Sequence, residues 1–335
     1  MKINHSNIPE LRHSYEEFIN EWNNDLGYIE IQTSGSTGKP KTIRLAKTSM
    51  LASAKKTLQY FDLKKHDRVI LCLPMQTVAA KMMIVRAIQG DLELELITPS
   101  TTPLKEINKD AHFIAMTPMQ ASSCLNKCPN KYRHLKKVLL GGAPIDPKLE
   151  KDLLNLKPIG IYHSYGMTET ASHVAIRELS KEKDKKYTAL PGIHFEIDSR
   201  DCLIINYPEV STSKIISNDV IQLLNSSTFI WKGRHDFIIN SGGIKIHVEE
   251  LEKSIRENFD LPFFISAIKD RELGEKIAMY IESTEYIDTQ LIKNKLVSIL
   301  EKHQIPKEYF VLPQLKYNQG GKIDRTKTKS HAPSQ

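Results

Sequence analysis

A short segment rich in glycine, hydroxyl residues and lysine follows the apolar run at residues 28–32. Its members are Thr33, Ser34, Gly35, Ser36, Thr37, Gly38, Lys39, Pro40 and Lys41. Glycines let backbone N–H groups turn toward a ligand, hydroxyls donate hydrogen bonds and lysines add positive charge, which together suit a phosphate group. The segment is not a Walker loop, because Gly35 and Gly38 are separated by two residues rather than four and a proline follows Lys39. It predicts a phosphate site and argues against a phosphate-loop NTPase or kinase.

Three further blocks of polar residues and glycine follow along the chain. They are His163-Ser164-Tyr165-Gly166-Met167-Thr168-Glu169-Thr170, Gly233-Arg234-His235-Asp236 and Gly321-Lys322-Ile323-Asp324-Arg325. With residues 33–41 they closely resemble, in order, the signatures of the adenylate-forming superfamily, which includes acyl-CoA synthetases, peptide-synthetase adenylation domains and luciferases. One such block would be weak, but four in the right order are specific. The resemblance implies an enzyme that uses ATP to join a carboxylic acid to AMP and then transfers the acyl group.

The resemblance implies a nucleotide site built from several of these blocks. Adenylation crowds negative charge around the α-phosphate, and the resemblance gives Glu169 the role of holding Mg²⁺ there. Thr168 would contact the α-phosphate, and Tyr165 with the adjoining Gly166 would lie against adenine. The adenine-side loop would be Gly141, Gly142, Ala143 and Pro144.

The ribose site is implied at a second acid. Asp219 falls where the family has a carboxylate that binds both ribose hydroxyls, and one carboxylate can accept two such hydrogen bonds. Ser217 and Asn218 precede it in place of the family's usual Thr-Gly. Arg234 would add a second ribose or phosphate contact.

The resemblance also implies a catalytic lysine on a moving domain. Asp236 would be the hinge, since a few backbone angles can absorb such a rotation. In one pose Lys322 would reach the α-phosphate and the substrate carboxylate, and would stabilise the charge that develops during displacement. In the other pose Lys322 withdraws, and the face near Gly242 and Gly243 lines a tunnel for coenzyme A (CoA).

The elements that must position these residues follow an α/β rhythm. Apolar runs alternate with amphipathic stretches through two thirds of the chain, and the runs end in Gly, Pro, Ser or Thr, where α/β proteins place ligands. We predict an α/β fold with a large domain at residues 1–235, trimmed at its start, and a small mobile α+β domain at 236–335. The polar, aperiodic residues 325–335 are predicted to be mobile. Expected strands are 28–32, 68–74, 92–98, 112–117, 136–142, 158–166, 262–269, 276–283 and 309–313, and expected helices include 49–61, 77–88, 118–127, one opened by Asp146 and Pro147, 248–259 and 289–303.

Within the superfamily the chain most resembles the short bacterial o-succinylbenzoate:CoA ligases of menaquinone synthesis. Their substrate has two carboxylates, so a spare cation should recognise the one that does not react. We hypothesise that Lys81 or Arg86, on the helix that follows Gln76, has this role, the alternative being that both face solvent. His163 and Ser164 could also line the acyl pocket.

Relatives carry a long region before the phosphate loop. That loop starts here at Thr33, so either the acyl pocket is more open or a homodimer partner supplies its wall.

Composition leaves room for this reading. The formal charge of +7 is spread among interleaved acids rather than gathered in a tract, so ATP and CoA account for it as well as nucleic acid would. No apolar stretch suits a membrane span or a signal peptide, which predicts a soluble cytoplasmic protein. The expected ligands are ATP, Mg²⁺, CoA and a small carboxylic acid, with no nucleic acid and no membrane. The rival functions are CoA ligation of another acyl or aryl acid, loading of a carrier protein, and an idle nucleotide-binding module.

Overall fold

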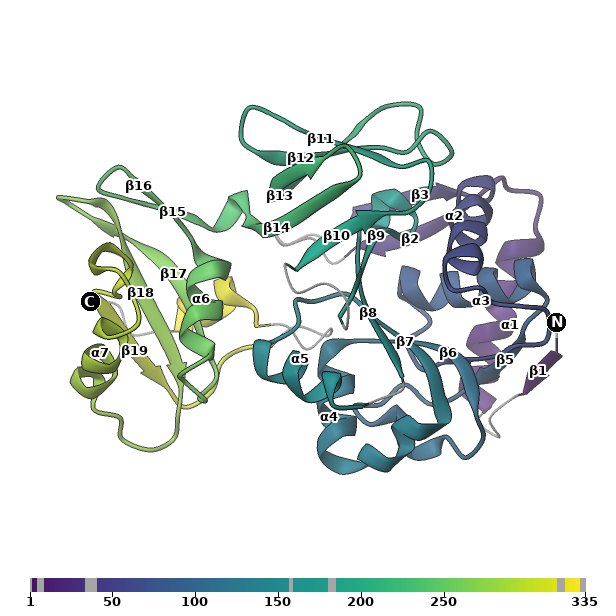
Figure 1. Cartoon of the computed structure of the whole chain (residues 1–335), viewed down its shortest axis with the longest axis horizontal. Coiled ribbons are helices and arrows are strands. Elements are labelled where there is room, and N and C mark those ends of the chain that lie inside the picture. The colour runs from purple at the N-terminus through teal and green to yellow at the C-terminus, as the bar shows by residue number, and fades with distance from the viewer. Residues whose placement is uncertain are drawn as a thin grey trace.

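The computed structural model describes residues 2–4, 9–33, 41–156, 159–179, 185–317 and 323–331. Two sheets of different size dominate it, and Figure 1 shows the smaller one, with the C-terminus, beside the larger. No helix in these described ranges is both long and apolar enough to cross a membrane.

The larger sheet has twelve strands in the order β1-β5-β4-β6-β7-β8-β9-β10-β14-β13-β12-β11. Pairing is parallel from β1 to β8 and antiparallel from β8 to β11. The strands in chain order are β1 (Lys2–Asn4), β4 (Arg68–Leu71), β5 (Glu93–Leu96), β6 (Ala111–Met116), β7 (Leu135–Leu140), β8 (Gly160–Gly166), β9 (His173–Glu178), β10 (Lys186–Ala189), β11 (His194–Ile197), β12 (Cys202–Asn206), β13 (Ile215–Asn225) and β14 (Thr228–Arg234).

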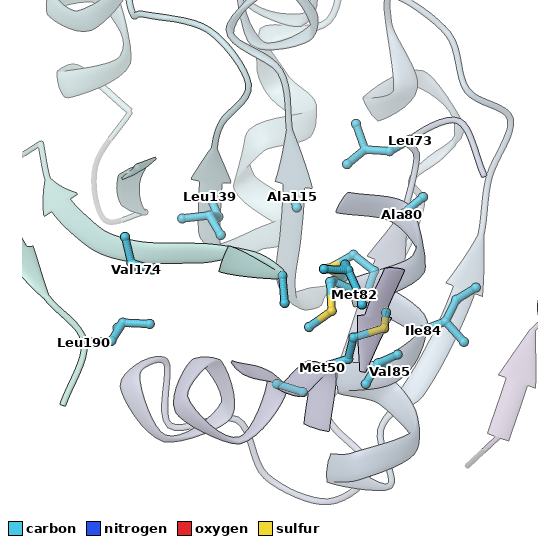
Figure 2. Packing of buried hydrophobic residues seen from close by; sticks show 14 of the residues in the cluster. Met50, Leu73, Ala80, Met82, Ile84, Val85, Ala115, Leu139, Val174 and Leu190 are labelled. Carbon is cyan, nitrogen blue, oxygen red and sulfur yellow. The ribbon is translucent and has the colours of Figure 1, made fainter. Parts of the chain in front are cut away.

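Helices cover both faces of the parallel half, as such sheets require. Val69 and Leu71 of β4 enter the core beneath α1, α2 and α3, whereas Ile70 enters the core beneath α4 and α5. Figure 2 shows the first core, where Met50 of α2 lies close to Met82 of α3. The helices are α1 (Pro9–Asn23), α2 (Lys47–Tyr60), α3 (Val78–Gly90), α4 (Pro118–Lys127) and α5 (Pro147–Leu154), and the 3₁₀ turns here are η1 (Pro103–Glu106), η2 (Pro129–His134) and η3 (Thr168–Thr170). The predicted α/β class is confirmed.

A separate hairpin, β2 (Tyr28–Thr33) and β3 (Lys41–Ala46), brackets the glycine-rich segment. Sequence analysis gave no strand after that segment, yet Ile43 and Leu45 alternate with polar neighbours as a half-buried strand requires. Thr33 and Lys41 are the last paired residues of the hairpin. The two ends of the segment between them are therefore held next to each other by the hairpin.

The smaller sheet has five strands and two cores. Two expectations were wrong: the helix predicted to reach residue 303 ends at Val297, and residues 325–331 of the segment predicted to be mobile form α8, while residues 332–335 lie outside the described residues. Asp324 Oδ1 accepts from the Lys327 backbone 2.9 Å away, and Thr328 is buried, so the polar α8 is held by a cap and one inward face. The elements are η4 (His235–Phe237), β15 (Ile238–Ser241), β16 (Ile244–His247), α6 (Val248–Arg256), β17 (Phe263–Asp270), β18 (Gly274–Glu282), α7 (Thr289–Val297), η5 (Lys302–Gln304), β19 (Glu308–Leu312) and α8 (Arg325–His331).

Candidate active site

The candidate residues gather at the carboxyl ends of neighbouring parallel strands. Gln76 follows β4, the loop that begins at Gly141 follows β7, and Tyr165 ends β8 beside η3. Such an edge is where open α/β sheets bind ligands. Ser34, Gly35, Ser36, Thr37, Gly38 and Lys39 lie outside the described residues, as do Gly321 and Lys322, and Thr33 is described only as a backbone strand residue.

Tyr165, Asp219 and Arg234 come together from three strands. The Tyr165 hydroxyl donates to Asp219 Oδ2 at 2.7 Å, and Arg234 Nη1 lies 3.9 Å from Asp219 Oδ1. Asp219 and Arg234 are cross-strand partners in β13 and β14. Burial, reinforced by the Asp219 charge, raises the pKa of Tyr165 well above its ordinary value, so the phenol stays a donor. The structure thus places the predicted adenine and ribose residues in one cluster.

Trp231 belongs to this cluster and was missed by sequence reasoning. Its indole N–H donates to Asp219 Oδ1 at 3.2 Å. Trp231 lies on β14 three residues before Arg234, a spacing that the sequence did not connect with Asp219. Each Asp219 oxygen already accepts one protein donor and keeps a lone pair, which is the arrangement a ribose diol needs.

The signature turn after β8 has no room for side chains at its glycine. A Cβ at Gly166 would lie 2.5 Å from His173 Cα, which real contacts essentially never allow. Thr170 Oγ1 closes the turn by accepting from the Met167 backbone at 3.0 Å. Ala171 follows with φ of 61°, a left-handed conformation uncommon outside glycine. The turn is therefore fixed by packing rather than by sequence propensity.

Thr168 and Glu169 are presented by η3. Glu169 is exposed, and no described residue pairs with its carboxylate. In the part of the chain that the structure describes, no three His, Cys, Asp or Glu side chains could hold a metal ion by themselves. One free carboxylate fits Mg²⁺, since this ion is commonly held by one or two acids together with substrate phosphates.

The side chains of His163 and Ser164 bond to backbone carbonyls in the loop after β7 and at the end of that strand. His163 Nε2 lies 3.0 Å from the carbonyl oxygen of Ala143, and Tyr187 Oη lies 2.7 Å from His163 Nδ1. Burial, with the nearby Arg177 charge, lowers the pKa of His163 to about 4, so the ring is neutral and donates from Nε2. Ser164 Oγ donates to the Leu140 carbonyl at 2.9 Å. Their contact with the acyl group stays a prediction.

The loop itself approaches these residues closely. A Cβ at Gly141 would lie 2.6 Å from Ser164 Oγ, whereas Gly142, with φ of 81°, has open space on that side. Ala143 is half-buried and Pro144 is exposed. Gly141 is required for packing and Gly142 for its backbone conformation.

Lys81 is not available as a substrate cation. Its Nζ lies 2.8 Å from Glu21 Oε2 and 5.3 Å from the ring centre of Phe18, both on α1. The lysine therefore ties α3 to α1, because an ammonium that already has a carboxylate and an aromatic face is satisfied. Gln76 is exposed before α3.

Arg86 is the exception among the buried cations. Its side chain is inside the large core with the whole residue only 3% exposed, Nη2 donates to Ser172 Oγ at 2.6 Å, and Nε has no partner. No described carboxylate pairs with it. Burial lowers its pKa to about 10, which leaves the guanidinium charged at neutral pH.

The Arg86 head lies next to the signature turn. Ser172, its hydrogen-bond partner, offers its own carbonyl to Thr170 Oγ1 at 2.6 Å. The adjacent His173 is kept neutral, because burial, followed by the Arg86 charge, lowers its pKa well below the ordinary value. A buried positive charge without an anion thus adjoins η3.

The segment after β14 carries the expected hinge. Asp236 Oδ2 accepts from Arg234 Nη2 at 2.5 Å, and Asp236 Oδ1 accepts from Asn218 Nδ2 at 3.3 Å. Gly242 and Gly243, with φ of 58° and 84°, form the exposed turn between β15 and β16. The structure brings Asp236 to the ribose cluster and leaves both glycines at the surface.

Two acids of α6 that sequence reasoning missed adjoin this segment. Glu249 Oε1 accepts from the Arg234 backbone at 3.3 Å, while Oε2 is buried without a partner, and burial raises the Glu249 pKa to about 7. Glu252 is buried and accepts from the Ile265 backbone at 2.7 Å. A helix with several acidic residues is expected from its sequence to face solvent. The local sequence does not indicate which of these acids are buried.

Arg325, three residues after Lys322, contacts both α6 and the segment of the expected hinge. It donates to Glu252 Oε2 and to the Ile265 carbonyl, both at 2.9 Å, and its guanidinium carbon lies 4.6 Å from the ring centre of Phe237. An antiparallel β-bridge pairs Tyr317 with Ile323, the residues on either side of 318–322. The described flanks of Lys322 are therefore anchored on α6 and β17.

Comparison with known proteins agrees with this arrangement. Residues 14–201 match the model of the AMP-binding enzyme family, and the chain belongs to that family of adenylate-forming acid ligases. A crystal structure of an acyl-CoA synthetase (AMP-forming)/AMP-acid ligase II-like protein from Dyadobacter fermentans is 32% identical, with a TM-score of 0.64 over 98% of this chain and 95% of that one.

More distant relatives differ in substrate. The 2-succinylbenzoate–CoA ligase of Staphylococcus epidermidis is 24% identical over 89% of this chain and 68% of its own. The D-alanine–D-alanyl carrier protein ligase of Listeria innocua is 23% identical over 90% and 69%. The Bacillus subtilis o-succinylbenzoate CoA synthetase, solved with ATP and magnesium, is 22% identical with a TM-score of 0.79 over 90% and 69%. These likenesses leave the acid and the acyl acceptor open.

Proposed function

We propose that this protein activates a dicarboxylic acid, o-succinylbenzoate being the best candidate, and transfers it to CoA. A carboxylate oxygen attacks the α-phosphorus of ATP as the bond to pyrophosphate breaks, which gives the acyl-adenylate. The CoA thiol then attacks the acyl carbonyl, loses its proton, and AMP leaves. Bound Mg²⁺ would neutralise phosphate charge, and Glu169 is the residue we assign to hold it.

The observation that carries this proposal is the buried Arg86 guanidinium, which has no described carboxylate partner. A buried charge is costly unless it is paired, so its retention beside η3 favours a substrate that brings the anion. A bidentate guanidinium–carboxylate pair would also discriminate strongly between dicarboxylates and monocarboxylates.

The same observation weighs against carrier loading with an amino acid. If the acyl group lies beside Arg86, as we propose, the ammonium of a substrate such as D-alanine would be repelled by this buried cation. Similarity alone does not separate the two functions, because the carrier-protein ligases and the CoA ligases match at nearly the same identity.

The remaining roles follow the site. Tyr165, Gly166 and the Gly141 loop would hold adenine, Asp219 and Arg234 the ribose, and Thr168 the α-phosphate. We assign residues 33–39 to the phosphates and Lys322 to the charge that develops at the α-phosphate. We further propose that residues 236–335 rotate about Asp236, so that Lys322 leaves and the Gly242–Gly243 face admits CoA.

The test is mass-spectrometric detection of o-succinylbenzoyl-CoA from the full chain with o-succinylbenzoate, ATP, Mg²⁺ and CoA. We expect the thioester from the wild type and not from Lys322→Ala. Parallel reactions with D-alanine, with ATP–pyrophosphate exchange as the readout, test the rival. Exchange with D-alanine but not with o-succinylbenzoate would overturn the dicarboxylate assignment.

A further inference from the structure

Helix α6 lies against β14 (Figure 1), and two side-chain contacts join them. Glu249 Oε1 accepts from the Arg234 backbone N–H at 3.3 Å, and Glu250 Oε1 lies 3.0 Å from Lys232 Nζ. Both strand residues precede Asp236 in the chain, and both glutamates follow it. A rotation of the part after Asp236, which we call the smaller unit, therefore has to break these contacts.

Glu249 is the more enclosed of the two glutamates. Its Oε2 atom is buried without a partner among the described residues, whereas Glu250 is exposed. A Cβ at Gly233 would lie 2.6 Å from Glu249 Oε2, so the carboxyl occupies the space that this glycine leaves open. The Glu249 carboxyl is thus fitted against β14, but only one of its oxygens is satisfied there. We call its contact with the Arg234 N–H the α6 latch.

The charged groups around the α6 latch do not neutralise Glu249. They are Arg234 on β14, Glu252 on α6 and Arg325 on α8. Arg234 pairs with Asp236 and Arg325 pairs with Glu252, and within the described ranges neither arginine forms an ion pair with Glu249. Burial raises the pKa of Glu249 to about 7, although the Arg325 charge acts in the opposite direction. A carboxylate in this place is therefore less stable than the neutral acid at mildly acidic pH.

Separation of α6 from β14 would return the Glu249 carboxyl to water, where its pKa has the ordinary value of 4.5. The orientation that buries Glu249 therefore binds a proton more tightly than an orientation that exposes it. Protonation favours the latched orientation fully below about pH 4.5, and this preference is lost as the pH rises through about 7.

We propose that Glu249 is a positioning residue, whose protonated carboxyl holds α6 on β14 and so keeps the smaller unit in this orientation. Loss of the proton releases the α6 latch, because a carboxylate gains more from water than from one backbone N–H. This inference rests on the rotation about Asp236 that we propose as part of the function, and it names the group that controls that rotation.

Hydrogen exchange at the Arg234 amide tests the α6 latch without turnover, because this N–H is the donor to Glu249. It is measured on the full chain by residue-resolved mass spectrometry, with the intrinsic exchange rate at each pH divided out. We expect protection of this amide to fall about tenfold between pH 6 and pH 8 in the wild type and to stay constant in Glu249→Gln, which cannot ionise.

The matched control is Glu250→Gln, which removes the other contact between α6 and β14 from an exposed position. Its Arg234 amide should keep the fall in protection between the two pH values. A fall of the same size in Glu249→Gln, or no fall in the wild type, would overturn the proposal.

Half-reactions then separate the α6 latch from the proposed function. Since we assign adenylation and thioester formation to different orientations, the ratio of their rates should change about tenfold between pH 6 and pH 8 in the wild type, relative to Glu249→Gln. Protection that depends on Glu249, together with an unchanged ratio, would support the latch and refute the proposed rotation. Thioester formation with protection that does not depend on Glu249 would refute the latch and leave CoA ligation standing.

Discussion

Arg86 Nη2 and Ser172 Oγ lie 2.6 Å apart, and this hydroxyl is the closest oxygen acceptor the structure gives the buried guanidinium. A second buried arginine, Arg177, has instead a bidentate partner in Glu150 at 3.0 and 2.9 Å. Both side chains are almost fully enclosed. This contrast is the basis on which we assign Arg86 to a substrate carboxylate and Arg177 to the fold.

Replacing Arg86 with methionine should not destabilise the protein. Exchanging an uncompensated buried charge for an apolar side chain is neutral or stabilises by about 1–3 kcal/mol, whereas Arg177→Met strands Glu150 and should cost about 3–5 kcal/mol. Urea unfolding of both variants measures this. Similar losses of stability in the two would show that Arg86 is a structural residue.

Neutralising Glu169 should impair adenylation without affecting the fold. Glu169 is exposed and has no described partner, so Glu169→Gln removes only the carboxylate that we assign to Mg²⁺. We expect ATP–pyrophosphate exchange to fall about 10- to 100-fold and the Mg²⁺ requirement to rise. The control is Glu257→Gln on the surface after α6, and a loss of the same size in that variant would contradict the assignment.

Stability should decline as the pH rises toward 8, in part because of Glu249. Its folded pKa of about 7 lies above the ordinary value of 4.5, since burial disfavours the charged form. The folded state therefore binds the proton more tightly, and this contribution is present below about pH 4.5 and lost as the pH passes 7, by up to about 3 kcal/mol. Urea midpoints at pH 5.5 and 8 should differ more for the wild type than for Glu249→Gln, and an equal difference would rule out this carboxyl as the cause.

Replacing Arg325 should impair adenylation, the step to which we assign Lys322, more than thioester formation. Arg325→Gln leaves buried Glu252 with Arg256, 3.8 Å away, as its cationic partner and loosens Phe237, which should cost about 1–3 kcal/mol of stability in the smaller unit. We expect adenylation to fall further than thioester formation from added acyl-adenylate, as for Lys322→Ala. A uniform loss in both half-reactions would mean that Arg325 acts only on folding, and Lys327→Gln on the exposed side of α8 is the control.

Much of the fold could be predicted because parallel strands that are buried on both faces have continuous apolar sequences. Residues 68–71, 111–116 and 135–140 are of this kind. The strand at Lys41–Ala46 escaped because only alternate residues are buried, and α8 escaped because its stability comes from a cap and from Arg325 rather than from an apolar stripe. The local sequence pattern predicts strands that are buried on both faces better than it predicts elements that are held by contacts with distant residues.

The site could be predicted as a set of motifs but not as a set of contacts. Lys81 and Arg86 were equal candidates in sequence, yet five residues turn a helix by about 140° beyond one full turn, so they face different elements. Lys81 meets Glu21 of α1, and Arg86 meets Ser172, the residue before β9. His163 and Ser164 likewise belong to a strand whose side chains alternate, and one bonds to Ala143 in the loop after β7 while the other bonds to Leu140 at the end of β7.

The measurement that tests the central claim most directly is the ratio of kcat/KM for o-succinylbenzoate to that for 4-oxo-4-phenylbutanoate, which lacks the benzoate carboxylate. It is measured in the wild type and in Arg86→Met by pyrophosphate release. We predict a ratio of about 100 or more in the wild type, as the loss of a paired buried charge requires, and a ratio that falls below about 10 in the variant. A ratio that is the same in both proteins would contradict recognition of a second carboxylate by Arg86.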